Sequence, residues 1–187
     1  MYTKIIFPFI VFILGGLVNH FWEKYKSRIK TLKYNVLHNY LGATMEEPSF
    51  GKVEVTYNGN LVKSLFMTKV NLKNDSNSDI TNLELSLFCD PDSGILVSHG
   101  GKKSSVQLLG FTEEFKKVIR ESKNNNILKR REYIVPVLNR GEKLEFSLLI
   151  TNFKGNKPHV EVECNHKGVT LEYEKEVPRI FGAPQKQ

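Results

Sequence analysis

Residues 133–150 read YIVPVLNRGEKLEFSLLI, and this stretch decides the fold class. In its later half, apolar side chains recur at every second position, at Leu144, Phe146, Leu148 and Ile150. A period of two places these side chains on one face of an extended strand, whereas a helix would space them by three and four. The run 133–138 is also strand-like, and the NRG sequence between the two runs has the composition of a tight turn. The stretch therefore predicts two strands joined by a turn.

The same period of two recurs along most of the chain after residue 52. Polar segments separate the runs, such as NGN at 58–60 and NDSNSD at 74–79. About eight strands, spaced 8 to 15 residues apart, are expected. This pattern is typical of an all-β sandwich or barrel. The alternating residues are Val53, Val55 and Tyr57; Phe66, Thr68, Val70 and Leu72; Leu83, Leu85, Leu87 and Cys89; Val160, Val162 and Cys164; and Val169, Leu171 and Tyr173.

One segment breaks the strand pattern. Phe111, Phe115, Val118 and Ile119 follow the helical spacing i, i+4, i+7 and i+8, which predicts a short amphipathic helix. Thr112 is suited to cap its N-terminus. We expect this helix to close one end of the sandwich.

Two passages resemble a known class of domain. Residues 133–150 resemble the segment of bacterial immunoglobulin-like domains in which apolar-Pro-apolar, turn, Gly-Glu and alternating strand follow one another. Residues 70–88, VNLKNDSNSDITNLELSLF, resemble their strand-loop-strand with a polar Asn/Asp hairpin. The resemblance implies an immunoglobulin-like antiparallel β-sandwich and brings no catalytic motif with it.

The N-terminal segment 5–22, IIFPFIVFILGGLVNHFW, contains no charged side chain. As a helix it would be about 27 Å long, close to the ~30 Å hydrocarbon core of a bilayer. A cleaved signal peptide fits less well because no small-x-small cleavage pattern follows. A buried core helix is disfavoured because the segment has no polar face. We therefore expect a retained transmembrane helix, with Trp22 among its interfacial aromatic residues.

The charge is unevenly distributed. The chain has 27 basic and 20 acidic residues, a net of +7. Residues 1–43 hold 6 basic and 1 acidic residue, while residues 44–187 are nearly neutral. The second part lacks the concentrated basic face of a nucleic-acid duplex binder. Basic side chains after the apolar segment include Lys24, Lys26 and Arg28, and such residues are retained on the cytoplasmic side and attract anionic lipid.

These features define the expected organisation of a single-pass inner-membrane protein. It comprises an external N-terminus (1–4), a transmembrane helix (5–22), a basic stalk (23–30), a cytoplasmic β-sandwich (31–178) and a disordered tail (179–187). The stalk has two interpretations. Trp22, Tyr25, Ile29, Leu32 and Val36 follow a heptad seam, whereas the alternation around residues 32–36 suits a first strand.

Two basic features are candidate ligand sites. The first comprises Lys129, Arg130, Arg131 and Arg140 near the ends of the 133–138 strand, with Tyr133 between them. Arginine forks suit phosphates and a tyrosine ring can stack on a base, although charges of this kind also guard strand edges. The second is the segment SHGGKKSS at 98–105, where Lys102, Lys103 and backbone amides could hold a phosphate in an otherwise ordinary exposed loop.

No motif predicts catalysis, a metal site or a cofactor. The five histidines are scattered without ligand spacing, and no Walker A, GxSxG or HExxH sequence is present. Cys89 and Cys164 could pair in an exported domain, but in a reducing cytoplasm we expect two free thiols.

The leading functional hypothesis is a non-enzymatic sensor or effector whose β-domain binds a ligand or partner and alters the association of membrane helices. Its partners would be membrane lipid and further copies of the chain or another membrane protein. The plan is similar to that of small membrane effectors of bacterial antiphage systems that respond to cyclic nucleotides, although those usually carry two membrane helices. The alternative is a membrane-tethered scaffold that docks a protein through a strand edge. An exported envelope domain is a third hypothesis.

Overall fold

The computed structural model describes residues 15–19, 22, 30–49, 51–102, 108–122 and 127–175. Its elements are β1 (Lys30–Ala43), β2 (Met45–Glu47), β3 (Gly51–Val53), β4 (Val55–Tyr57), β5 (Asn60–Val62), β6 (Ser64–Asn74), β7 (Ile80–Cys89), β8 (Ser93–Lys102), β9 (Gly110–Phe111), α2 (Glu113–Glu121), β10 (Arg130–Leu138), β11 (Lys143–Asn152), β12 (Val160–Cys164) and β13 (Val169–Tyr173).

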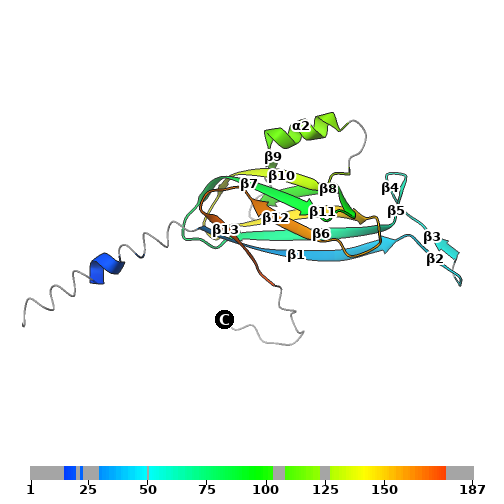
Figure 1. Cartoon of the computed structure of the whole chain (residues 1–187), viewed down its shortest axis with the longest axis horizontal. Coiled ribbons are helices and arrows are strands. Elements are labelled where there is room, and N and C mark those ends of the chain that lie inside the picture. The colour runs from blue at the N-terminus through cyan, green and yellow to red at the C-terminus, as the bar shows by residue number, and fades with distance from the viewer. Residues whose placement is uncertain are drawn as a thin grey trace, which may run out of the picture.

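Two packed sheets form a β-sandwich, which confirms this part of the predicted fold class (Figure 1). The five-stranded sheet has the order β13-β1-β6-β11-β8, and the four-stranded sheet has the order β12-β7-β10-β9. All neighbours are antiparallel except β1 and β13, which run parallel. Residues 133–150 thus supply one strand to each sheet, and the turn between them carries the chain across the sandwich.

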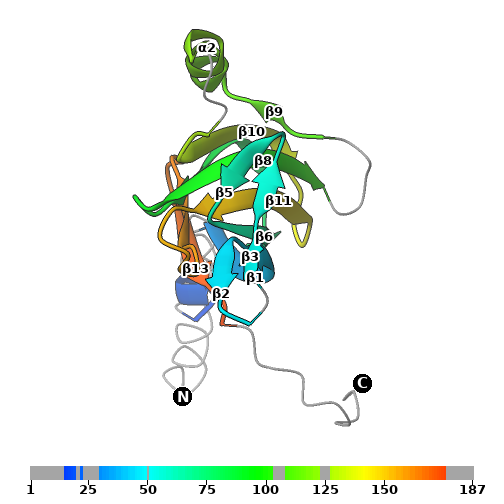
Figure 2. The same cartoon turned by 90° about the vertical axis from the view of Figure 1, so that its right-hand side faces the viewer.

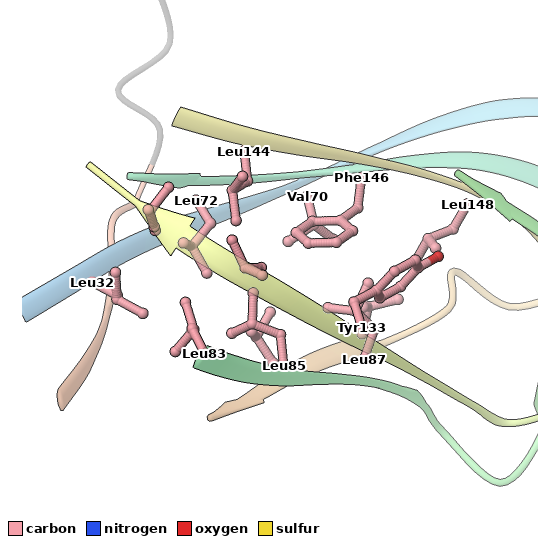
Figure 3. Close-up of a cluster of buried hydrophobic side chains, with 14 of the residues drawn as sticks. Leu32, Val70, Leu72, Leu83, Leu85, Leu87, Tyr133, Leu144, Phe146 and Leu148 are labelled. Atoms are coloured by element: carbon pink, nitrogen blue, oxygen red, sulfur yellow. The ribbon is translucent and has the colours of Figure 1, made fainter. Parts of the chain in front are cut away.

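The core lies between the inner faces of the two sheets. Alternation gives each strand one apolar face, and burial of that face is the main force that holds the layers together. Side chains from both sheets meet in Figure 3, including Val70 and Phe146 from one sheet and Leu85 and Tyr133 from the other. The predicted inner faces of β6, β7 and β11 are confirmed, with Leu72, Leu83 and Leu144 fully buried among them.

The segment that had two interpretations is a strand. β1 pairs with β6 over most of its length, and Leu32 is completely buried in the core. The heptad interpretation is therefore wrong for Leu32 and Val36, because a strand and not a helix presents them. The sandwich begins at Lys30, where β1 starts.

Two small hairpins extend beyond the sheets at the end of the molecule where β1 ends (Figure 1). β2 pairs with β3, and β4 pairs with β5. The alternation at 52–57, which suggested one strand, is divided between β3 and β4. The turn of the second hairpin has positive φ angles at Asn58 (49°) and Gly59 (80°), the conformation that a two-residue turn between twisted strands requires.

The predicted helix is present as α2. The Thr112 hydroxyl accepts a hydrogen bond from the Phe115 amide at 3.2 Å, which confirms the cap. Phe111 belongs to β9 and not to the helix. The expectation that the helix closes one end is wrong: α2 lies along the flank, beside β9 and β10 (Figures 1 and 2). Of its residues only Phe115 is buried, so the helix contacts the sandwich over a narrow area.

Most of the expected transmembrane segment 5–22 lies outside the described residues. Within it, residues 15–19 and Trp22 are helical and exposed. No helix among the described residues is long and apolar enough to span a bilayer. Predictions on residues 1–4, on Lys24, Lys26 and Arg28, and on the 179–187 tail also fall outside what the structure describes.

Candidate ligand-binding groove

The predicted basic cluster is only partly assembled. Lys129 is exposed and its Nζ donates a hydrogen bond to the Pro91 carbonyl at 2.8 Å. Arg130 is also exposed, pairs with Glu132 and lies over the Phe88 ring, 5.2 Å from its centroid. These two side chains face outward along the strand and make the contacts of an ordinary solvated edge.

Arg131 has a different environment. Its side chain is buried, with 6% of the residue exposed. Nη2 donates to the Ile95 carbonyl at 2.8 Å, and the guanidinium lies over the Phe115 ring at 5.7 Å. Burial lowers the pKa of this guanidinium, but arginine remains charged at neutral pH. Arg131 therefore brings a positive charge to the place where β8, β10 and α2 meet.

Tyr133 is a core residue. It is 1% exposed, and its ring packs against Phe111 and Phe146 with centroid distances of 5.1 and 4.9 Å. Burial raises the pKa of its hydroxyl. The predicted role in stacking on a base is not supported, because the buried ring is not accessible to a ligand from solvent.

Arg140 does not join the cluster. It lies in the turn after β10, where its backbone amide donates to the Asp79 carboxylate at 2.8 Å. The nine residues of β10 begin at Arg130 and end before Arg140, and they span about 30 Å at about 3.3 Å per residue. The structure therefore places Arg130 and Arg140, two of the predicted phosphate-binding residues, at opposite ends of β10.

The Gly-rich segment is largely strand and not loop. Residues 98–102 belong to β8, so their backbone groups take part in pairing with β11. A Cβ on Gly100 would lie 2.6 Å from the Phe146 ring, so this glycine is required for packing. Lys102 forms a largely buried ion pair with Glu142 at 3.1 Å, and Lys103 lies outside the described residues. Because Lys102 pairs with Glu142 within the fold, the structure does not support the predicted phosphate site at residues 98–105.

A groove of about 790 Å³, here called the α2 groove, opens on the described surface. It runs between the edge of β8, the inner side of α2 and the β4–β5 hairpin. Its volume falls in the range of small-molecule sites. The groove is lined by Tyr57, Asn58, Asn60, Leu61, Val62, Lys63, Leu96, Val97, Ser98, Phe111, Ile119, Ser122, Ile127, Leu128, Arg131, Thr151 and Phe153.

Four large apolar side chains form the walls of the α2 groove while remaining partly in solvent. Their exposed fractions are 56% for Leu61, 39% for Ile119, 37% for Ile127 and 50% for Phe153. At one end Ile127 and Phe153 close over Gly94, where a Cβ would lie 2.2 Å from the Ile127 Cγ2 atom. Exposed apolar side chains gathered around a concave surface indicate a binding site more strongly than scattered ones.

The charge in the α2 groove has one sign. Among its described lining residues, Lys63 and Arg131 are basic and none is acidic. Arg131 lies at the buried side, and Lys63 lies exposed at the rim. The described lining therefore favours an anionic ligand over a cationic one.

Two buried hydroxyls have no hydrogen bond in the described part of the chain, Ser98 Oγ and Tyr133 Oη. Ser98 belongs to the groove lining, whereas Tyr133 lies in the core. The Ser98 hydroxyl opposes the rise in the Tyr133 pKa, although the two oxygens lack the geometry of a hydrogen bond. Buried polar groups are nearly always paired, so the Ser98 hydroxyl marks a place where a polar atom of another molecule would be stabilised.

Sequence reasoning finds only part of this site. It identifies Arg131, but among the wrong neighbours. It assigns Ile119 to a covered helix face, and the alternation around Leu61 indicates nothing beyond a strand. The sequence does contain an indication of Ile127 and Phe153 as groove residues. Both are apolar and flank predicted strands without belonging to the inner faces of those strands.

A second, smaller hollow of about 480 Å³ opens between β1, β13 and the segment before β12. His38 lies in it and its Nδ1 is 2.8 Å from the Thr68 hydroxyl. Burial, together with the positive charges of Lys157 and His159, lowers the pKa of His38 to about 4. His38 is therefore neutral at physiological pH.

The two thiols are free and far from each other. Cys89 lies opposite Val160 and Cys164 opposite Leu85, so three residue pairs of the β7–β12 ladder lie between them. Burial raises the pKa of each to about 11, which disfavours the reactive thiolate. No cluster of metal-binding side chains occurs among the described residues.

Comparison with known proteins gives little beyond this. No protein-family model matches the chain, and no curated protein matches it. Solved structures with some similarity include a protein described as membrane anchored from Corynebacterium diphtheriae, with 11% identity and a TM-score of 0.37 over 73% of this chain and 33% of that one. This chain thus matches about a third of that protein's length.

Two further solved structures are similar at the same level. The RrgA Jo.In complex shares 9% identity with a TM-score of 0.30, over 60% of this chain and 81% of that one. A family IIIa CBD from Clostridium cellulolyticum shares 11% identity with a TM-score of 0.30, over 74% of this chain and 97% of that one. The β-sandwich assignment rests on the strand pairing described above.

Proposed function

We propose that this protein is a non-enzymatic, membrane-anchored sensor or effector, in which an immunoglobulin-like sandwich binds a ligand in the α2 groove. Ligand binding would change the association of the N-terminal membrane helices between copies of the chain. A setting in bacterial defence with a nucleotide signal belongs to this proposal through similarity of plan alone.

The observation that carries the proposal is the α2 groove itself. It combines a volume of about 790 Å³, a buried arginine and a buried hydroxyl that lacks a hydrogen bond within the described chain. Convergent polar groups in an otherwise apolar hollow are the usual features of a ligand site. The apolar segment 5–22 supports the membrane anchor.

The position of α2 suggests how binding could be transmitted. Because Phe115 is the only buried residue of the helix, α2 can adjust its position at small cost compared with a strand of the core. A ligand that contacts both Ile119 of α2 and Leu96 of β8 would stabilise one such position. Arg131 couples this movement to the sandwich because it contacts Phe115 and Ile95 together.

The test uses the full chain in phosphatidylcholine nanodiscs. Thermal unfolding is measured against cyclic nucleotides, nucleoside phosphates, sugars and amphiphiles, with Ile119→Asp as the groove variant. Val118→Asp is the matched control, since Val118 lies next to Ile119 on the same helix, is 47% exposed and does not line the groove. We expect at least one compound to raise the melting temperature of wild type and of Val118→Asp but not of Ile119→Asp.

The sensor step is tested separately in liposomes. Two fluorescently labelled populations of the chain report self-association by energy transfer, with and without the compound that raises the melting temperature. We expect the transfer efficiency to change in wild type and to stay constant in Ile119→Asp. Equal transfer under all conditions would contradict the sensor function.

A second candidate, docking of a protein partner through a strand edge, is favoured by the outer edge of β8. This edge is bridged at Ile95 by Leu128 and at Gly101 by Leu108, and the Leu109 amide donates to the Gly100 carbonyl at 2.8 Å. Leu96, Val97 and Ser98 in this interval line the α2 groove. An extended segment of a partner could add to β8 there.

A further inference from the structure

We infer that the ligand of the α2 groove is a single-chain anionic amphiphile, in which a carboxylate or phosphate head is attached to an acyl chain. This inference rests on the ligand-binding part of the proposed function and names the chemistry of the ligand. The head would be held near Arg131 and Ser98, and the chain would lie against the apolar walls.

Charge complementarity determines the sign of the head. Both charged residues of the described lining are basic, and Arg131 is 6% exposed. In a partly buried site a charge interacts through a lower effective dielectric constant than at the surface, so lining charges of one sign discriminate strongly between ligands. A cationic head at this place would be repelled by Arg131 and by Lys63.

The Ser98 hydroxyl determines where the head lies. Ser98 Oγ belongs to the groove lining and is buried without a hydrogen bond within the described chain. It can donate to an oxygen of a carboxylate or phosphate. Arg131 is held nearby because its Nη2 donates to the Ile95 carbonyl, three residues from Ser98 on the same strand.

The apolar walls determine the chemistry of the tail. On β8 the groove is lined from Leu96 to Ser98, about 7 Å of strand at about 3.3 Å per residue. At the Gly94 end, Ile127 and Phe153 lie against the strand, and Leu61 contributes from the neighbouring hairpin. Each buried methylene of an acyl chain would contribute about 0.8 kcal/mol in such surroundings. A fully polar anion would leave these walls in water.

The test measures binding to the full chain in phosphatidylcholine nanodiscs by isothermal titration calorimetry. The probes are decanoate, decyl phosphate and the oppositely charged decyltrimethylammonium. Partition into the bilayer is the same for every variant, so the difference between variants reports the groove. We expect decanoate, decyl phosphate or both to bind wild type and Val118→Asp, and to bind Ile119→Asp at least about 10-fold more weakly.

A second pair of variants tests the charge at the rim. Lys63→Glu reverses an exposed side chain of the lining, and Lys143→Glu makes the same change at an exposed position outside it. We expect Lys63→Glu to weaken binding of the anionic probes several-fold and Lys143→Glu to leave it unchanged. These surface changes keep the test decisive if Ile119→Asp does not fold.

The outcomes distinguish a fatty acid from a phosphate headgroup, and they distinguish failure of this inference from failure of the proposed function. Binding of decanoate alone identifies a fatty acid head, and binding of decyl phosphate alone identifies a phosphate headgroup. Equal binding of the cationic probe, or equal affinities in all variants, overturns the inference. If a nucleotide or an extended peptide protects wild type but not Ile119→Asp while no amphiphile binds, the inference fails and the groove remains a ligand site. If an amphiphile binds without changing self-association, the inference holds and the sensor function fails.

Discussion

Arg131 shows how one position can serve both packing and a binding site. The burial pattern of β10 places it on the same strand face as Tyr133 and Val135, so period two alone assigns it to the core side. At the start of the strand that core side opens into the α2 groove. A positive charge is tolerated there because Phe115 and the Ile95 carbonyl contact the guanidinium.

The predicted pH dependence of stability is also argued at the residue scale. The pKa of His38 is about 4 in the folded chain and its ordinary value is 6.5. As the pH falls below 6.5 the unfolded state binds this proton first, so the folded state loses stability between pH 6.5 and pH 4. The loss should be on the order of 1–2 kcal/mol, less than the full shift implies because the ring is only half-buried.

This dependence is measured by urea unfolding of the full chain at pH 7 and at pH 4.5. His38→Gln keeps a polar side chain near the Thr68 hydroxyl but has no titration, so the difference between the two pH values should shrink in this variant. An NMR titration of the His38 ring gives its pKa directly. A midpoint near 6.5 would contradict the prediction.

At the element scale, α2 is the part of the described fold with the smallest contact to the rest. Its stability depends on local interactions: the Thr112 cap, the two glutamates of its first turn, and the single anchor Phe115. The apolar side chains that the helix pattern assigned to the core, Val118 and Ile119, stay partly in water. A helix with an apolar face that remains uncovered is suited to cover a ligand.

Removing the cap should therefore loosen the groove before it unfolds the sandwich. The Thr112 hydroxyl accepts from Phe115 and donates to Glu132 at 2.9 Å. Thr112→Ala should cost about 1 kcal/mol. Hydrogen exchange of the amides of α2 should increase several-fold, while exchange in β6 and β11 stays unchanged. Thr112→Ser keeps the hydroxyl and is the control; equal exchange in both variants would refute this role of the cap.

At the scale of the whole molecule, β1 relates the two ends of the sandwich. β1 spans the sandwich, about 45 Å for 14 residues at about 3.3 Å each, from its start at Lys30 to the small hairpins at the far end. β1 therefore begins at the end of the sandwich opposite to the β4–β5 hairpin (Figure 1). In the proposed arrangement, the hairpin side of the groove faces away from the bilayer.

The proposed orientation is tested by fusions to the C-terminus. The basic residues that follow the apolar segment should retain the sandwich in the cytoplasm, so a fluorescent protein fusion should be active and an alkaline phosphatase fusion inactive. Replacing Lys24, Lys26 and Arg28 together by Glu should invert a measurable fraction of the chains. Phosphatase activity in the unchanged protein would favour the exported envelope domain instead.

Much of the fold could be predicted from the sequence, for a local reason. Alternation at Leu83, Leu85 and Leu87 predicts a strand with one buried face, because an extended chain places every second side chain on the same face. The helix at 113–121 was equally predictable from its spacing and from Thr112. The candidate site was harder to predict, since Leu61, Ile119 and Phe153 come from different elements and only their meeting makes a groove.

The sequence by itself determined the strands, the capped helix and the concentration of charge near the N-terminus, because each depends on neighbours in the chain. Tertiary structure alone decided that Tyr133 is core, that Lys102 pairs with Glu142 and that α2 lies along the flank. It also decided that Arg131 and Lys63 line one groove. The physical reason is that burial and charge pairing depend on which strands become neighbours. The order of the strands in the sheets cannot be read from the spacing of apolar residues within one segment.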